Sequence, residues 1–148
     1  LYLLDKTNNQ VWKHNATTSG FGNGTGWLKE DVNLRNAVGL SIDGSVWIAF
    51  TDGIRQYVNG AESLWRMQSI DPADFRLREL VIPATGSSLF VLDEMGKRVI
   101  EMVKDTGKIL AQYPLPAEQI RDFAVDPTKK EILLLTNSQL LRLTYEKK

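Results

Sequence analysis

The residues of this chain with the clearest chemical potential are two aspartates that end similar apolar segments. Asp5 follows residues 1–4 and Asp93 follows residues 89–92, so strands of one type would place both carboxylates at equivalent heights. Aligned carboxylates are oxygen ligands suited to a hard cation or to a substrate hydroxyl. An aspartate at a strand end also accepts N–H bonds from the turn that follows it. Because the acid recurs together with its turn, we favour the turn interpretation and predict neither a catalytic residue nor a metal ligand here.

Other chemistry-bearing residues are sparse. His14 is the only histidine and the chain has no cysteine, whereas zinc sites are generally built from several imidazole or thiolate ligands. No glycine-rich phosphate loop and no nucleophile elbow occurs in the sequence. We therefore expect a protein that is not an enzyme and holds no cofactor.

The charge balance limits the partners that we expect. The 148 residues include 18 basic and 18 acidic side chains, which gives a formal net charge of zero. Basic residues alternate with acids, as around Arg78, and we interpret this stretch as solvated surface rather than as a basic face. No apolar run approaches the roughly 18–20 residues of a membrane span. We expect neither nucleic acid nor membrane as a partner.

The elements that would position these residues form an internal repeat. Four apolar segments, residues 1–5, 46–50, 89–93 and 132–136, recur about every 43–45 residues. A period of about 40–45 residues is typical of β-propellers, whose blades are four-stranded sheets. The sequence therefore predicts an all-β fold of about four blades of antiparallel strands, open or incomplete, with residues 1–148 forming a single propeller region. Continuous apolar segments of this kind are expected to be covered on both faces.

The repeat divides the chain into four units: a partial blade at 1–34, blades at 35–78 and 79–118, and a partial blade at 119–148. Asx-Gly turns at residues 43–44, 52–53 and 59–60 separate the four strands expected in the second unit, because such dipeptides supply the positive φ of hairpin turns. The predicted strands are 1–5, 10–14, one beginning at Trp27, 37–42, 46–50, 54–58, 64–67, 80–82, 88–93, 98–103, 109–113, 122–125, 131–136 and 140–144.

Three further segments have a predicted local structure. Residues 15–26, rich in Gly, Asn, Ser and Thr, are predicted to form a long loop. Residues 71–74 are predicted to open one helical turn, since an acid before proline presets a helix start. The leucine-rich residues 133–145 also fit a helix, but Asn137 and Ser138 are poor interior helix residues and the strand register of the repeat favours strands.

The two ends of the repeat do not complement each other. The first unit lacks an innermost strand and the last unit lacks an outermost one, so strand edges stay open at both ends. Open edges recruit other chains. We expect self-association through the terminal blades.

Two stretches resemble the NHL repeat. Residues 1–11 (LYLLDKTNNQV) carry its apolar strand, acid, short Asn-rich turn and restart, and residues 89–100 (LFVLDEMGKRVI) place Arg98 at the usual basic position. In the other two units, Phe50 and Thr136 replace the acid. The resemblance implies part of a propeller of roughly six blades, in a class whose members bind proteins, RNA or small molecules and include a few lyases and lactonases.

We therefore predict a non-enzymatic scaffold or recognition module that binds a protein or peptide through loops on one face, because loops carry binding functions on rigid scaffolds. The alternative is a portion of a lactonase-like or lyase-like propeller enzyme whose metal ligands lie partly outside this chain. The candidate partner-binding residues of the favoured hypothesis come from the turns after the repeated strands: Lys6, Asn9, Asp52, Glu94, Lys97 and Asn137.

Overall fold

The computed structural model describes residues 1–71, 73–116 and 119–145. In this part of the chain there is no helix, and all regular structure is antiparallel β-sheet, as predicted. The strands are β1 (Tyr2–Asp5), β2 (Gln10–Thr17), β3 (Gly20–Gly26), β4 (Ala37–Ile42), β5 (Val46–Phe50), β6 (Gly53–Val58), β7 (Ala61–Glu62), β8 (Leu77–Val81), β9 (Ser88–Asp93), β10 (Arg98–Val103), β11 (Ile109–Pro114), β12 (Asp122–Asp126), β13 (Glu131–Leu135) and β14 (Leu140–Thr144).

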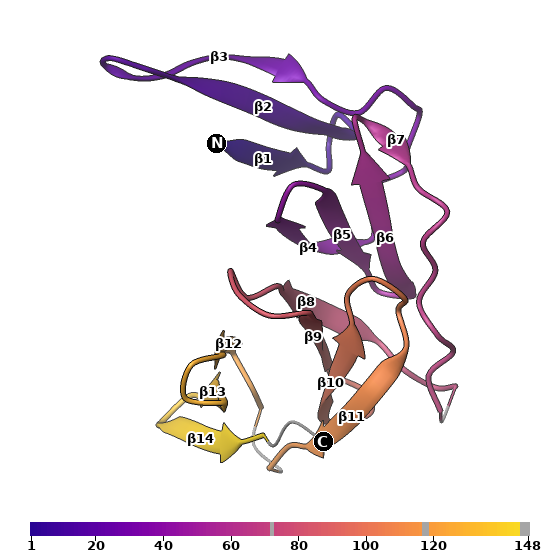
Figure 1. Cartoon of the computed structure of the whole chain (residues 1–148), viewed down its shortest axis with the longest axis vertical. Coiled ribbons are helices and arrows are strands. Elements are labelled where there is room, and N and C mark those ends of the chain that lie inside the picture. The colour runs from indigo at the N-terminus through magenta and orange to yellow at the C-terminus, as the bar shows by residue number, and fades with distance from the viewer. Residues whose placement is uncertain (72, 117–118, 146–148) are drawn as a thin grey trace.

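The strands form four separate sheets that follow one another in chain order. The first sheet is β1-β2-β3, the second β4-β5-β6-β7, the third β8-β9-β10-β11, and the fourth β12-β13-β14. The sheets stack along an arc, with β1, β4, β8 and β12 on its concave side and β3, β7, β11 and β14 on the outside (Figure 1). The arc does not close, so the fold is that of an incomplete propeller.

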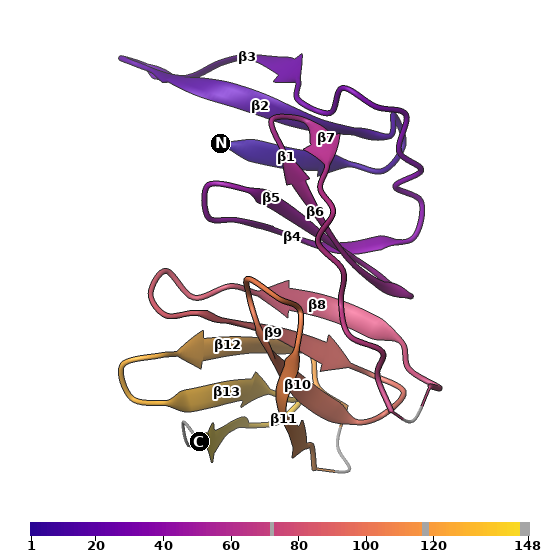
Figure 2. The same cartoon turned by 45° about the vertical axis from the view of Figure 1, so that its right-hand side comes forward.

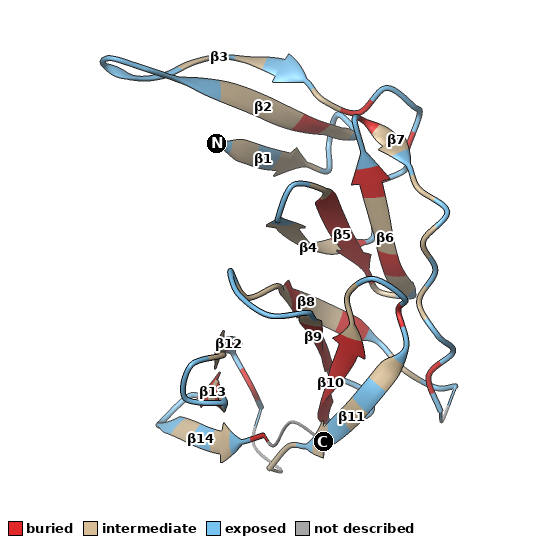
Figure 3. Cartoon of the chain, viewed as in Figure 1, coloured by how far each residue is buried: buried red, intermediate tan, exposed pale blue. Residues whose placement is uncertain are grey.

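Each pair of neighbouring sheets encloses an apolar layer. Residues of β9 alternate between two of these layers: Leu89 and Val91 pack in the layer shared with the second sheet, and Phe90 and Leu92 in the layer shared with the fourth. Every residue of β5 is buried, and in β9 only Ser88 is not (Figure 3). For these two central strands, the prediction of cover on both faces is confirmed.

The same prediction is wrong for the strands in the first and last sheets. Leu3 on β1 is 47% exposed and Leu135 on β13 is 45% exposed. Tyr2 and Leu4 do pack toward the second sheet, so one face of β1 is covered and the other is not. The physical reason is that each end sheet has a neighbour on one side only among the described residues.

The prediction of a loop at residues 15–26 is also wrong. β2 continues to Thr17, and β3 pairs with it through partners such as Ala16 and Phe21. β2 and β3 form a hairpin that protrudes from the arc (Figure 1). Polar and glycine-rich residues thus form strands here without a buried side-chain layer, which is why their composition pointed to a loop.

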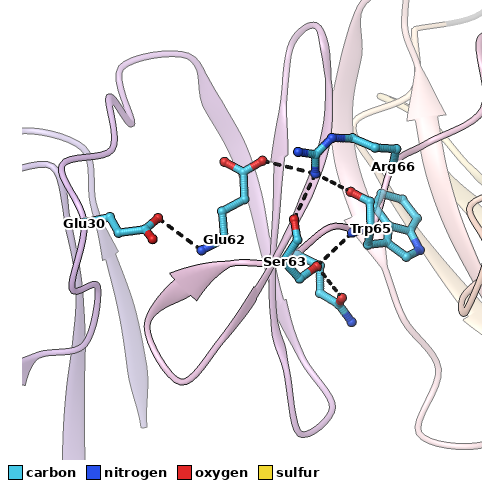
Figure 4. A network of polar contacts seen from close by, with 6 residues as sticks. Glu30, Glu62, Ser63, Trp65 and Arg66 are labelled. Carbon is cyan, nitrogen blue, oxygen red and sulfur yellow. Dashed lines mark hydrogen bonds and ion pairs between the residues drawn. The ribbon is translucent and has the colours of Figure 1, made fainter.

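The predicted strand at residues 64–67 is replaced by a link between sheets. β7 ends at Glu62, and a polar network then turns the chain away from the sheet (Figure 4). The Arg66 guanidinium donates to the carbonyls of Ser63 and Trp65 at 2.9 and 2.7 Å, which turns these carbonyls away from strand pairing. The Trp65 ring instead packs edge-on against Trp47, with 5.0 Å between ring centroids.

The strand predicted to begin at Trp27 does not form: β3 ends at Gly26, and Trp27 lies in the link to β4. Asp71 and Ala73 lie in bends rather than in a helical turn, and Pro72 of that prediction lies outside the described residues. β8 begins at Leu77, before the predicted strand at 80–82. The leucine-rich segment forms β13 and β14, so the strand interpretation is confirmed over the helical one.

Candidate functional site

One side of the arc carries the turns that contain the predicted site residues. The β1–β2, β5–β6, β9–β10 and β13–β14 turns lie on this side together with the links between sheets (Figure 2), and we refer to these turns and links as the turn face. The β4–β5, β8–β9 and β12–β13 turns lie on the opposite side.

Two turns of this face share one geometry. Residues 6–9 and 94–97 both join strands through four residues, because Asp5 pairs with Gln10 and Asp93 with Arg98. Their last residues, Asn9 and Lys97, have φ of 53° and 48°. The left-handed conformation is uncommon for residues other than glycine, so its recurrence indicates that the two turns are of the same type.

Asp5 organises the first of these turns. Its carboxylate accepts the backbone N–H groups of Thr7 and Asn8, both at 3.0 Å, and the Asn8 side-chain amide at 2.7 Å. The Trp12 indole N–H also donates to it at 3.0 Å. The Asn8 side chain, followed by the Asn8 backbone and Trp12, lowers the pKa of Asp5 to about 2. The carboxylate is thus engaged within its own turn.

Asp93 likewise accepts hydrogen bonds from the turn that follows it, but it is buried. It accepts the Gly96 N–H of its turn at 3.0 Å and the Arg76 N–H of the preceding link at 3.0 Å. Its other oxygen accepts the Arg98 Nε–H at 2.8 Å, and the Asp93 residue is 0% exposed. Arg98 also donates to the Asp71 carbonyl. This buried pair therefore ties the β9–β10 turn to the link from the second sheet.

The second and fourth units have Phe50 and Thr136 in place of the aspartate, and other interactions occur at their turns. In the fourth sheet, the Thr136 hydroxyl accepts the backbone N–H groups of Ser138 and Gln139. In the second sheet, the Phe50 ring lies 4.5 Å from the Arg55 guanidinium. A carboxylate is therefore one of several solutions for stabilising this turn.

A pocket of about 230 Å³ lies on the turn face between the third and fourth sheets. Its apolar lining comes from Leu92 of β9 and from the link that leads to β12. Its polar lining includes two of the predicted site residues. The lining residues are Leu92, Leu115, Pro116, Ile120, Arg78, Glu94, Lys97 and Gln119.

Arg78 is the residue of this pocket that the sequence interpretation missed. Its guanidinium donates to the carbonyls of Ile120 and Arg121, and lies 3.7 Å from a Glu94 carboxylate oxygen. Its side chain is 30% exposed, so the solvated-surface interpretation of this stretch is wrong for Arg78. The available signal was that Arg78 lies between Leu77 and Leu80, two apolar residues that are both buried in β8, which places an arginine on a strand between two sheets.

The remaining predicted residues lie at other junctions of the same face. Asn9 accepts the Leu34 N–H at 2.9 Å and lines an open hollow of about 630 Å³ between the first and second sheets. Asp52 lines another hollow, of about 530 Å³, with Arg55 and Arg66. Lys6 is exposed in its turn, and Asn137 accepts a hydrogen bond from Arg121. Only Glu94 and Lys97 meet in one pocket.

The described residues contain no group of three or more His, Cys, Asp or Glu side chains arranged to hold a metal ion. His14 lies on β2, where its Nδ1 is 2.9 Å from the Gly22 carbonyl oxygen of the adjoining strand. No helix that could cross a membrane occurs in the part of the chain that the structure describes.

The stacked antiparallel sheets of three and four strands and the turn face define the class of fold, which is that of a β-propeller segment. No family model matches the chain and no curated protein sequence matches it. Solved structures do match.

A chain of the nidogen/laminin complex matches with a TM-score of 0.58 and 12% identity, over 85% of this chain and 49% of that one. The computationally designed Ika8 protein gives a TM-score of 0.59 and 9% identity, over 97% of this chain and 45% of that one. Hsv2 of Kluyveromyces lactis gives 0.51 and 8%, over 74% and 33%. The chain thus spans between a third and half of these structures, and the likeness concerns their fold.

Proposed function

We propose that this propeller segment is a non-enzymatic recognition module that binds a protein or peptide through its turn face. The observation that carries the proposal is the pocket between the third and fourth sheets, where Glu94 and Lys97 flank an apolar lining. Binding sites commonly combine an apolar concavity with a few oriented polar groups. An apolar side chain of the partner would enter the pocket, and a carboxylate beside it would pair with Lys97.

Hydrogen bonds that attach the described ends of the link to the third sheet support this proposal. The Leu115 N–H donates to the Lys97 carbonyl at 2.8 Å, which attaches the link to the β9–β10 turn. Arg78 holds the other end of the link through the carbonyls of Ile120 and Arg121. A concavity that is formed before the partner arrives loses less conformational entropy on binding.

We further propose that the repeat is of the NHL type. The two segments that resemble that repeat, residues 1–11 and 89–100, form turns of one geometry with an aspartate at the start and a left-handed residue at the end. This shared turn is the structural feature that supports the assignment.

The binding proposal is tested by selecting linear peptides from a displayed random library against the immobilised chain. Enriched peptides are then synthesised, and their affinity for the wild type is measured by fluorescence polarisation. We expect Lys97→Glu to weaken binding by roughly tenfold or more, because it replaces the cation that pairs with the peptide by a like charge.

The matched control is Lys130→Glu. Lys130 also ends a four-residue turn with a left-handed φ, of 55°, but its turn lies on the opposite side of the arc. Peptide affinity should be unchanged in this variant. Selected peptides that respond to Lys130→Glu and ignore Lys97→Glu would overturn the proposal.

A further inference from the structure

Glu101 is a carboxylate within an otherwise apolar layer between two sheets. It lies on β10 and is 5% exposed. Its strand partner Phe90 packs in the layer between the third and fourth sheets, and Tyr113 and Tyr145 belong to that layer too. The β10–β11 pairing shifts register directly after Glu101, between it and Met102. Such bulges redirect side chains and are over-represented beside functional sites.

The Glu101 carboxylate has neutral hydrogen-bond partners. Ser88 Oγ donates to one carboxylate oxygen at 2.7 Å, and the Tyr113 hydroxyl donates to the other at 2.7 Å. The ion pairs of the described residues involve other carboxylates. A buried carboxylate normally requires a cationic partner or a metal to offset its lost hydration. Two hydroxyl groups fill only part of its capacity to accept hydrogen bonds.

A pocket of about 170 Å³ lies beside this carboxylate and is lined in part by residues of the β8–β9 and β12–β13 turns. Those turns lie on the side opposite the turn face (Figure 2). The pocket volume is several times the roughly 30 Å³ that one water molecule occupies in the liquid. Phe90 and Tyr145 line the pocket beside Glu101. Their ring centroids lie 5.2 Å apart and their planes are inclined by 62°, so the two rings form walls that meet at an angle.

The electrostatics of the pocket suit a cation. Burial, and after it the charges of Glu101 and Asp126, raise the pKa of Tyr145. Burial, the hydrogen bond to Glu101 and the charge of Glu101 raise the pKa of Tyr113. Both phenols therefore stay neutral in a negative potential, and aromatic faces attract cations. Lys130 is exposed and lines the same pocket, yet the ion pairs among the described residues include none between its ammonium and Glu101.

We propose that this pocket binds an alkylammonium group, with the Glu101 carboxylate as its counter-ion and the Phe90 and Tyr145 rings as its walls. This site is separate from the turn face: it is lined in part by turns on the other side of the arc and shares no lining residue with the pocket of Glu94 and Lys97. The combination of a carboxylate with aromatic walls distinguishes a compact organic cation from a neutral group of the same shape.

The proposal is tested with tetramethylammonium chloride as the probe, titrated into the wild-type chain at constant ionic strength. The ring resonances of Tyr145 and Tyr113 are followed by NMR. We expect saturable shifts with tetramethylammonium and no saturable shift with tert-butanol, a neutral molecule of similar size and shape. Equal shifts with both, or no shift with tetramethylammonium, would overturn the proposal without recourse to any variant.

Two variants assign the effect to the carboxylate. Glu101→Gln removes the charge; its amide oxygen still accepts from one hydroxyl, and its NH2 group donates to the oxygen of the other. It should weaken tetramethylammonium binding by roughly tenfold or more. Glu94→Gln removes a carboxylate on the turn face and should leave the affinity unchanged. Retention of wild-type affinity in a folded Glu101→Gln protein would refute the assignment.

Discussion

At the scale of single residues, equivalent positions in the four units show how the surroundings change the role of a side chain. Asp5 and Asp93 both accept N–H groups from their own turns. Asp5 does so beside solvent, whereas Asp93 is fully buried and pairs with Arg98. Breaking a buried pair leaves an uncompensated charge, which is strongly destabilising. The same residue type at the same repeat position thus contributes very differently to stability.

Glu79 provides a pH-dependent prediction. It lies on β8 next to Asp122 of the neighbouring sheet. Burial, followed by the hydrogen bond to Asp122 and the charge of Asp122, raises the pKa of Glu79 from 4.5 to about 7. Between these two pH values the folded state binds more protons than the unfolded state, so the free energy of unfolding falls as the pH rises. Above about pH 7, the ionisation of Glu79 no longer changes the free energy of unfolding.

The expected outcome is that Glu79→Gln is more stable than the wild type at pH 8 and of similar stability at pH 4.5. The difference should be on the order of 1 kcal/mol, because Glu79 is only half-buried and solvent screens its interactions. Urea denaturation at the two pH values measures it, with Glu131→Gln on β13 as the control for loss of a carboxylate. A pH-independent difference between wild type and Glu79→Gln would contradict the assignment.

At the scale of elements, the repeated apolar strand occurs in two environments. β9 lies between two sheets and β1 contacts one. Val91 is 0% exposed and Leu3 is 47% exposed, although they occupy the same position of the repeat. Burial is therefore a property of the stack and not of the strand sequence.

Val91→Asp should abolish folding, whereas Leu3→Asp should be tolerated. An unpaired charge in the layer around Val91 costs several kcal/mol against a total stability of about 5–15 kcal/mol. The carboxylate at position 3 would stay in water. Far-ultraviolet circular dichroism and thermal unfolding measure both effects. Equal tolerance of the two substitutions would show that β9 is not covered on both faces.

At the scale of the whole molecule, the arc ends in two apolar faces. Ile132 and Leu134 of β13 pack inward, so Leu135 and its strand partner Leu140 lie on the opposite, uncovered face, and Leu140 is 59% exposed. On the first sheet, Leu1 and Leu3 are similarly exposed. Contiguous exposed apolar surface commonly marks an interaction site.

We propose that the 148-residue chain self-associates through these end faces, with the first sheet of one copy against the fourth sheet of another. Sedimentation velocity at high micromolar concentration should show species larger than a monomer. A charge in either apolar face opposes this contact, so Leu3→Asp or Leu140→Asp should shift the distribution toward monomer. Purely monomeric wild-type protein at that concentration would contradict the proposal.

The sequence by itself determined the local features of this protein. The recurrence of apolar segments predicted an all-β propeller-like fold, and Asn59 and Gly60, with φ of 53° and 90°, form the predicted two-residue hairpin turn. Both signals depend on interactions within a few residues of the chain, such as turn hydrogen bonds and strand alternation. The turn that contains Glu94 and Lys97 could be predicted because it follows from its own sequence, whereas their role in binding stays a prediction.

Only the tertiary structure decided which residues of different sheets meet. The Arg78 contact with Ile120 spans 42 residues, and Tyr145 reaches the pocket of Glu101 from another sheet. The buried state of Asp93 and the exposed state of Leu3 follow from how many sheets flank each strand. Contacts between sheets depend on how whole sheets stack. The residue pattern within one strand therefore does not predict which residues of a neighbouring sheet it will contact.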